Sequence, residues 1–303
     1  MSRRFILPIV FSIAGILIGF YYIITTSQII ASLIPAYDLV PLLEGRLVAD
    51  GIRILILILP AYFIIFIILS LPIALLMMIG NRIAKTPFYT QSIMTIGQRF
   101  GGSQMIRRAL TPALFSLSFS ELVLGFFPGV LFAVPPYPAD LVSRRALFAF
   151  VEPLLSFFGA LITIGVAIAI YSPTWLLNDS GIVSHLKPGQ LEYRRCPDTE
   201  GVGKWYSNFV SGFALLAYPI SVVYKFFFQK FVVFEAQVNA LTVLESVLWI
   251  AGLPIMVMAF VLPVILLHEF TLNRTKLIVQ SMARGIGAKE VELESASPSE
   301  VSQ

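Results

Sequence analysis

The sequence has few of the side chains on which most catalytic and metal-binding sites are built. Its 303 residues include one cysteine, Cys196, and two isolated histidines, His185 and His268. A lone cysteine excludes a disulfide within the chain. The H-E-x-x-H motif of metalloproteases, the P-loop and the G-x-S-x-G motif of serine hydrolases are absent as well. The sequence therefore predicts no cofactor and no metal ion, and an intramembrane enzyme is the least favoured interpretation.

Charged residues are also scarce. They make up 13% of the chain against 57% hydrophobic residues, and the mean hydropathy is +0.87. A soluble globular domain has about 25% charged residues, so this composition indicates an integral membrane protein. The net charge of +4 comes without a basic stripe interleaved with aromatic residues. We therefore expect the basic residues to contact anionic lipid headgroups of the bilayer, and we expect no nucleic-acid partner.

Long apolar segments determine the predicted fold. A helix needs roughly 20 apolar residues to cross about 30 Å of hydrocarbon. Six segments meet this length: Phe5 to Thr25, Ile52 to Gly80, Ala109 to Val134, Ala146 to Ile170, Tyr206 to Phe228 and Leu241 to Leu267. In the first of them Gly15 and Gly19 match the G-x-x-x-G pattern, which favours close helix contact within the bundle. The sequence predicts an all-α integral membrane protein with a six-helix transmembrane bundle.

Lys and Arg are distributed unevenly between alternate loops. If the N-terminus is cytoplasmic, 15 of the 21 Lys and Arg residues lie in inner segments, and the outer segments keep Arg46, Arg53, Arg144, Arg145, Lys225 and Lys230. Cytoplasmic loops of membrane proteins carry such an excess of positive charge. We therefore predict a multi-pass protein of the cell membrane with both termini in the cytoplasm.

The inner loops predict a small amount of further structure. We treat residues 1–290 as one membrane domain and residues 291–303, rich in Ser and Glu, as a disordered cytoplasmic tail. The loop 171–205, between the fourth and fifth spans, should carry a β-hairpin, because Ile182 to Leu186 and Leu191 to Arg195 flank a Pro-Gly turn. Pro87 to Gln98 is a short amphipathic candidate that precedes the third helix.

Helix ends can also be predicted. Gly101, Gly102 and Ser103 should break the chain before the third helix, which then begins near Gln104. The last helix should run to about Met282 and end near Gly285 and Gly287.

Glu121 is the residue that most strongly suggests function. It falls near the midpoint of the third predicted span, where a charged group costs several kcal/mol unless it is paired, protonated or in contact with water. Ser118 shares its helical face. The fourth span carries Glu152, Ser156 and Thr163 on one stripe, and counting at 1.5 Å per residue puts Ser156 at the depth of Glu121.

Charged residues of the fifth and sixth spans extend this pattern. Ser221 and Lys225 lie on one face of the fifth, and Lys225 is at nearly the depth of Glu152 and Glu245, so an ionic layer is expected near the outer side. We call these candidates the transport seam: Glu121, Ser118, Glu152, Ser156, Thr163, Ser221, Lys225 and Glu245.

Two functions fit this pattern. The first is a transporter- or channel-like role, in which a proton, an ion or a small polar solute moves along the transport seam. The alternative is a non-catalytic membrane scaffold or complex subunit that docks a cytoplasmic protein through Gly181 to Arg195. Intramembrane carboxylates also occur as protonated, hydrogen-bonded packing groups, and this interpretation of Glu121 remains open.

Overall fold

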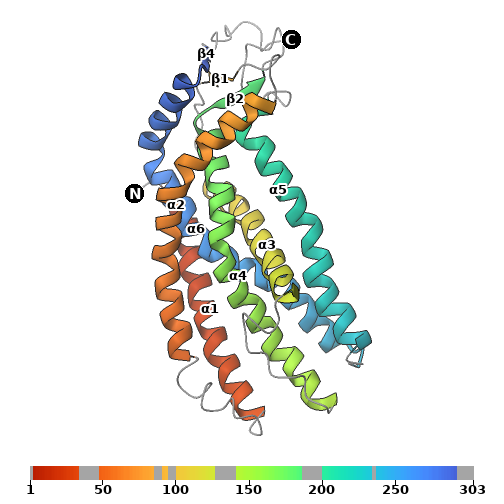
Figure 1. The fold of residues 1–303 in the computed structure, drawn as a ribbon. Helices are drawn as coiled ribbons and strands as arrows, with labels where there is room; N and C mark the ends of the chain where they lie inside the picture. Colours follow the sequence, from red (N-terminus) through yellow and green to blue (C-terminus); the bar gives the residue numbers. More distant parts are fainter. Residues whose placement is uncertain are drawn as a thin grey trace, which may run out of the picture. The chain divides into compact units, whose positions relative to one another are not determined.

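The computed structural model describes residues 3–33, 48–84, 91–94, 100–126, 141–185, 200–233 and 237–291. Most of them are helical (Figure 1). A 3₁₀ turn (Arg3–Phe5) leads into the helices, which are α1 (Ile6–Leu33), α2 (Val48–Ala84), α3 (Gly102–Phe126), α4 (Leu141–Asp179), α5 (Val202–Tyr218), the π-helix η3 (Pro219–Val233) and α6 (Ala240–Gly285). The strands are β1 (Ser92–Met94), β2 (Ile182–His185), β3 (Glu200–Gly201) and β4 (Lys289–Val291).

The membrane class predicted from composition is supported by the helices. Within the described residues, five are long and apolar enough to cross a membrane: Arg3–Thr26, Ile56–Ala84, Pro153–Asp179, Val202–Val232 and Ala240–Gly285. They correspond to five of the six predicted spans. The third predicted span begins within α3, and residues 127–134 of it lie outside the described residues. A count of six spans and the orientation of the termini stay predictions.

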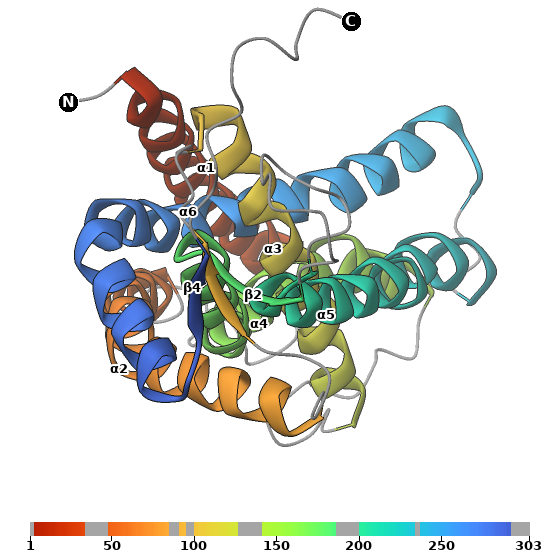
Figure 2. The same cartoon turned by 90° about the horizontal axis from the view of Figure 1, so that it is seen from above.

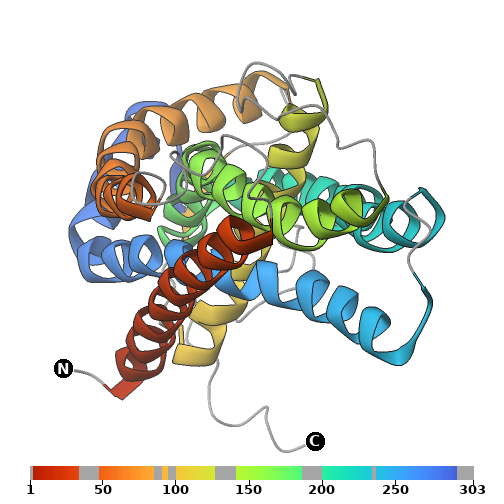
Figure 3. The same cartoon turned by 90° about the horizontal axis from the view of Figure 1, so that it is seen from below.

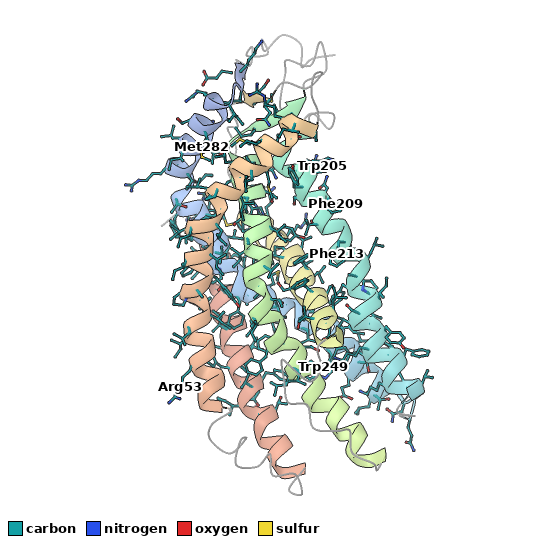
Figure 4. The ribbon with its side chains drawn as sticks, viewed as in Figure 1. Arg53, Trp205, Phe209, Phe213, Trp249 and Met282 are labelled. Carbon is teal, nitrogen blue, oxygen red and sulfur yellow. The ribbon has the colours of Figure 1, made fainter. Side chains whose placement is uncertain are left out.

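Large apolar side chains on these helices face outward. Leu17 of α1 and Ile67 of α2 are each 62% exposed. On α5 the aromatic residues Trp205, Phe209 and Phe213 follow one another at intervals of four residues along one side of the helix (Figure 4). Apolar surface of this extent is unfavourable in water and is the normal surface of a helix in lipid.

By their contacts the residues form two compact units. Unit 1 contains Met1–Ile64, Gly101–Ile168 and Ser211–Leu266, and unit 2 contains Ile65–Phe100, Ala169–Val210 and Leu267–Gln303. Each unit has its own core, and the residues that concern function divide between them.

In unit 1, α1 packs closely against α6. A Cβ atom at Gly15 would lie 2.2 Å from the Cβ of Ala259, and the Ser12 hydroxyl donates a 2.9 Å hydrogen bond to the Ala259 carbonyl. Figure 3 shows the two helices crossing. The contact explains the first glycine of the G-x-x-x-G pattern, because only a residue without a Cβ lets the backbones approach so closely.

In unit 2, a four-stranded sheet with the order β3-β2-β1-β4 is formed by segments far apart in sequence. β1 pairs antiparallel with β2, placing Ser92 opposite Val183, and parallel with β4, placing Ser92 opposite Lys289 (Figure 2). An apolar cluster of strand and helix residues forms the core: Ala74, Met78, Ile93, Leu176, Leu177, Ile182, Val202, Val279 and Ala283.

The predicted β-hairpin is only partly within the described residues. Its first strand is present as β2. The second predicted strand, Leu191 to Arg195, lies outside the described residues, so the hairpin stays a prediction. The described partners of β2 are β1 and β3, and β1 lies within the segment Pro87 to Gln98 that we expected to be amphipathic.

Helix ends agree with the sequence at two places and differ at a third. α3 begins at Gly102, and the Gln104 side chain accepts a 3.2 Å bond from the Gly101 N–H, half of a capping box. α6 ends at Gly285, as predicted. α4, however, continues to Asp179, so Trp175 is helical and 3% exposed although we expected it in the loop. The tail 292–303 is not among the described residues.

Candidate functional site

A buried ion pair joins α3 to the π-helix η3 in unit 1. The Lys225 ammonium donates to the Oε2 atom of Glu121 over 2.8 Å. The Lys225 side chain is 15% exposed and that of Glu121 is 7% exposed. Two opposite charges at this distance and burial interact far more strongly than an exposed pair, because little water screens them.

The second oxygen of Glu121 is also occupied. The Ser156 hydroxyl, from α4, donates a hydrogen bond to Glu121 Oε1. Ser156 itself is fully buried. The carboxylate is therefore held by an ammonium group on one oxygen and by a hydroxyl on the other, which offsets the cost of removing its charge from water. The structure brings together Glu121 and Ser156, the two residues that counting along the helices put at one depth.

Hydroxyl groups accompany Glu121 along α3. Ser118 donates to the Leu114 carbonyl of its own helix at 2.8 Å, whereas Thr163 of α4 donates to the Ser116 carbonyl of α3, also at 2.8 Å. Ser120 is 1% exposed, and its hydroxyl has no hydrogen-bond partner among the described residues. The part of unit 1 around Glu121 thus offers buried polar groups between otherwise apolar helices.

The π-helix changes which residues of the fifth span share a face. A π-helix closes its hydrogen bonds from residue i to i+5, and such segments are rare and frequent at functional sites. Lys225 and Lys230 are five residues apart within η3. An α-helix, with 3.6 residues per turn, directs residues five apart well away from each other, whereas the wider π turn brings them toward one face.

A second ion pair uses the other lysine of η3. Lys230 Nζ lies 2.7 Å from Glu245 Oε2 of α6, and the two side chains are 9% and 34% exposed. We expected Lys225 to pair with Glu152 or Glu245. The structure pairs Lys225 with Glu121 and pairs Glu245 with Lys230, and a pair of Lys225 with Glu152 stays a prediction. The Glu152 side chain is not among those that the structure describes.

Two further hydroxyl groups of the fifth span donate hydrogen bonds to backbone carbonyl groups. Ser221 donates to the Ala217 carbonyl over 2.7 Å, within the fifth span. Tyr218 precedes η3, and its hydroxyl donates to the Ile250 carbonyl of α6. Neither Tyr218 nor Lys230 was among the predicted site residues. Lys230 lies five positions after Lys225 in the sequence. In an α-helix these two residues would point in different directions, so the spacing did not indicate a shared face.

Comparison with known proteins identifies no relative of this chain. No protein-family model, no curated protein and no solved structure matches it.

The pair in unit 1 can exchange partners. A carboxylate held by a lysine can instead take a proton or bind another cation, and the lysine then loses its counter-ion. Ionisable groups inside a membrane characteristically mark proton relays and ion pathways. Glu121 thus has the chemistry to take up a proton or another cation, and in the structure Ser156 and Lys225 hold its carboxylate.

A different ionisable group lies in unit 2. His268 Nε2 is 2.6 Å from Asp179 Oδ2, and Glu269 follows His268 on α6. The His268 side chain is fully buried. Our expectation that His268 is isolated is therefore wrong. Its partner lies 89 residues earlier in the chain, a separation that no sequence motif records.

Proposed function

We propose that this protein is a transporter- or channel-like membrane protein in which Glu121 binds a proton, an ion or a small polar solute on its way along the transport seam. The observation that carries the proposal is the Glu121–Lys225 ion pair, which joins α3 to η3 at 2.8 Å with both side chains largely buried. The transported species and its direction are left open by this chemistry.

The energetic cost of the pair supports a functional role. Apolar residues of similar volume often stabilise a protein as well as a buried ion pair does, since they need no desolvation of charge. A charged group within the bilayer is costlier still. A pair that is expensive to keep and easy to replace by packing residues is typical of a site that uses its charges.

Lys225 would act as an internal competitor for the transported species. When Glu121 takes up a proton or a cation, the attraction that holds Lys225 weakens. η3 is then free to shift between π- and α-helical hydrogen bonding, which rotates Lys225 relative to Glu121. Lys230 and Glu245, the more exposed pair, would lie toward the outer surface if both termini are cytoplasmic, and would influence entry of charged species.

Flux into proteoliposomes tests this proposal. The purified chain is reconstituted alone, and uptake is followed for protons with a trapped pH dye and for Na⁺, K⁺ and Cl⁻ with ion-selective dyes. We expect flux of at least one species above that of empty liposomes, and a strong loss in Lys225→Gln. A matched control is Glu290→Gln, which removes one partner of an exposed pair with Arg284. If wild-type liposomes are as tight as empty ones for every species, the proposal is wrong.

The scaffold alternative has less support from the described residues. Its docking segment, Gly181 to Arg195, begins with β2, which is paired on both sides by β1 and β3. A strand paired on both edges has no backbone groups left to accept a partner strand. The alternative would gain support if the chain always purified with a stoichiometric companion.

A further inference from the structure

We propose that Asp179, His268 and Glu269 form a binding site for a divalent transition-metal ion in unit 2. The three side chains each offer one ligand atom, and these atoms all lie within 4.8 Å of one another. They come from the last residue of α4 and from α6. Nothing in the proposed transport role of Glu121 uses them.

The ligand chemistry selects the class of ion. One imidazole nitrogen with two carboxylate oxygens is a donor set used by Zn²⁺ and by other first-row divalent ions such as Mn²⁺. Ca²⁺ and Mg²⁺ prefer oxygen ligands alone. Three protein ligands also leave at least one coordination position for water or another ligand.

The distance between His268 and Asp179 is close to the one that an ion needs. With metal–ligand bonds of about 2.0–2.2 Å, two ligand atoms on one tetrahedral ion lie roughly 3.3 Å apart. His268 Nε2 and Asp179 Oδ2 are 2.6 Å apart. An ion that replaces the proton between them therefore requires these atoms to separate by less than about 1 Å, which small side-chain rotations supply.

The local charge favours a cation. The three ligand atoms belong to two carboxyl groups and one imidazole, so the ligand set itself is negatively charged when both carboxyl groups are ionised. Asp179 is also the C-terminal residue of α4, a helix of 39 residues. The C-terminal end of a helix carries a partial negative charge, which repels an aspartate and attracts a positive ion.

A separate observation concerns the second ring nitrogen. His268 is 0% exposed, and its Nδ1 atom has no hydrogen-bond partner among the described residues. A buried imidazole that serves only to pair with an aspartate normally satisfies both nitrogens. The pair with Asp179 thus leaves one buried nitrogen of the ring unsatisfied, and an ion bound at Nε2 would leave Nδ1 to carry the ring proton.

Aromatic rings enclose the histidine. The Phe66 ring lies edge-on to His268 at 6.0 Å between centroids, and the Trp175 ring lies at 6.2 Å. Both aromatic side chains are 3% exposed. Such an apolar shell limits the access of water to a bound ion and lowers the dielectric constant around it.

Metal binding by the full chain tests this inference. The protein is purified in detergent through a tag without histidine, stripped with a chelator, and titrated with Zn²⁺ and, separately, Mn²⁺ by calorimetry. We expect one ion per chain, and a dissociation constant at least tenfold weaker in His268→Gln and in Glu269→Gln, because even loss of a residue that only supports a ligand costs about 10–100-fold. Glu290→Gln, which removes an exposed carboxylate of unit 2 that pairs with Arg284, is the control that should keep wild-type affinity.

Two further measurements keep the test decisive. If His268→Gln aggregates, the affinity of Glu269→Gln is measured in its place. In addition, Co²⁺ is added to the wild type, and its visible d–d absorption reports whether the ion is bound by protein ligands. Wild-type protein that binds neither Zn²⁺ nor Mn²⁺ in stoichiometric amount, or variants that bind as the wild type does, overturn the inference. Neither result bears on flux through Glu121.

Discussion

Lys225 and Glu121 lie 104 positions apart in the chain, yet their charged atoms meet at 2.8 Å. Both side chains are largely buried, at 15% exposed for Lys225 and 7% for Glu121, and each charge is the other's partner. Breaking such a pair by removing one partner typically costs about 3–5 kcal/mol, because the remaining charge stays buried without compensation.

Removing both charges should therefore cost less than the two single losses together. We expect Glu121→Gln and Lys225→Met each to lower the free energy of unfolding by about 3–5 kcal/mol, and the double variant to lie much closer to the wild type than their sum predicts. Unfolding in detergent, followed by circular dichroism, measures the cycle. Strictly additive losses would show that the two residues do not interact in the protein.

Ser156 should contribute to the same site to a smaller extent. Ser156→Ala removes one donor from the Glu121 carboxylate, and a hydrogen bond to a charged group is worth about 1.5–3 kcal/mol. Ser246→Ala is the control, because among the described residues this buried hydroxyl bonds the Thr242 carbonyl of its own helix and no charged group. We expect Ser156→Ala to be the less stable of the two and to reduce flux without abolishing it. Equal stability of both variants would argue against the Ser156–Glu121 bond.

The contact between α1 and α6 gives a steric prediction. Gly15→Ala places a methyl group where 2.2 Å separates it from the Ala259 Cβ, whereas Gly252→Ala meets nothing within 4 Å. Overpacking of a tight helix contact costs roughly 1–3 kcal/mol, and alanine in an open helical position is favourable by up to about 1 kcal/mol relative to glycine. Thermal unfolding should thus rank Gly252→Ala at or above the wild type and Gly15→Ala below it. The reverse order would contradict this packing.

The sequence predicted the apolar helices well for a physical reason. A helix that crosses lipid needs a long uninterrupted apolar segment, and such a segment can be recognised from consecutive residues alone. The end of α6 at Gly285 was predictable for the same reason, since glycine commonly terminates a helix whatever the tertiary structure around it. Glu121 was recognisable because a charge stands out against such a background.

The partners of the charged residues were harder to predict. Lys225 was grouped with Glu152 and Glu245 by depth alone, whereas its contact with Glu121 depends on how α3 and η3 pack against each other. Asp179 and His268 meet only because α4 and α6 bring them together, and neither residue lies in a motif. The strand β4 pairs with β1, which lies far earlier in the chain, and this pairing is likewise a property of tertiary structure.

The orientation of the chain is open to direct labelling. In a Cys196→Ser background, a single cysteine is introduced at Ser2 or at Ser302. We expect both to be protected from a membrane-impermeant maleimide in intact cells and to react after the cells are opened, because the positive-inside bias puts both termini in the cytoplasm. Labelling of one terminus but not the other in intact cells would require an odd number of spans.

The flux of Glu121→Gln relative to the wild type tests the central claim most directly. Both proteins are reconstituted at equal density, after gel filtration has shown each to be folded and monodisperse, and are compared for the species that the wild type carries. We predict that glutamine, which fills the same space without a titratable charge, reduces the flux to the level of empty liposomes. A folded Glu121→Gln protein with wild-type flux would contradict the account.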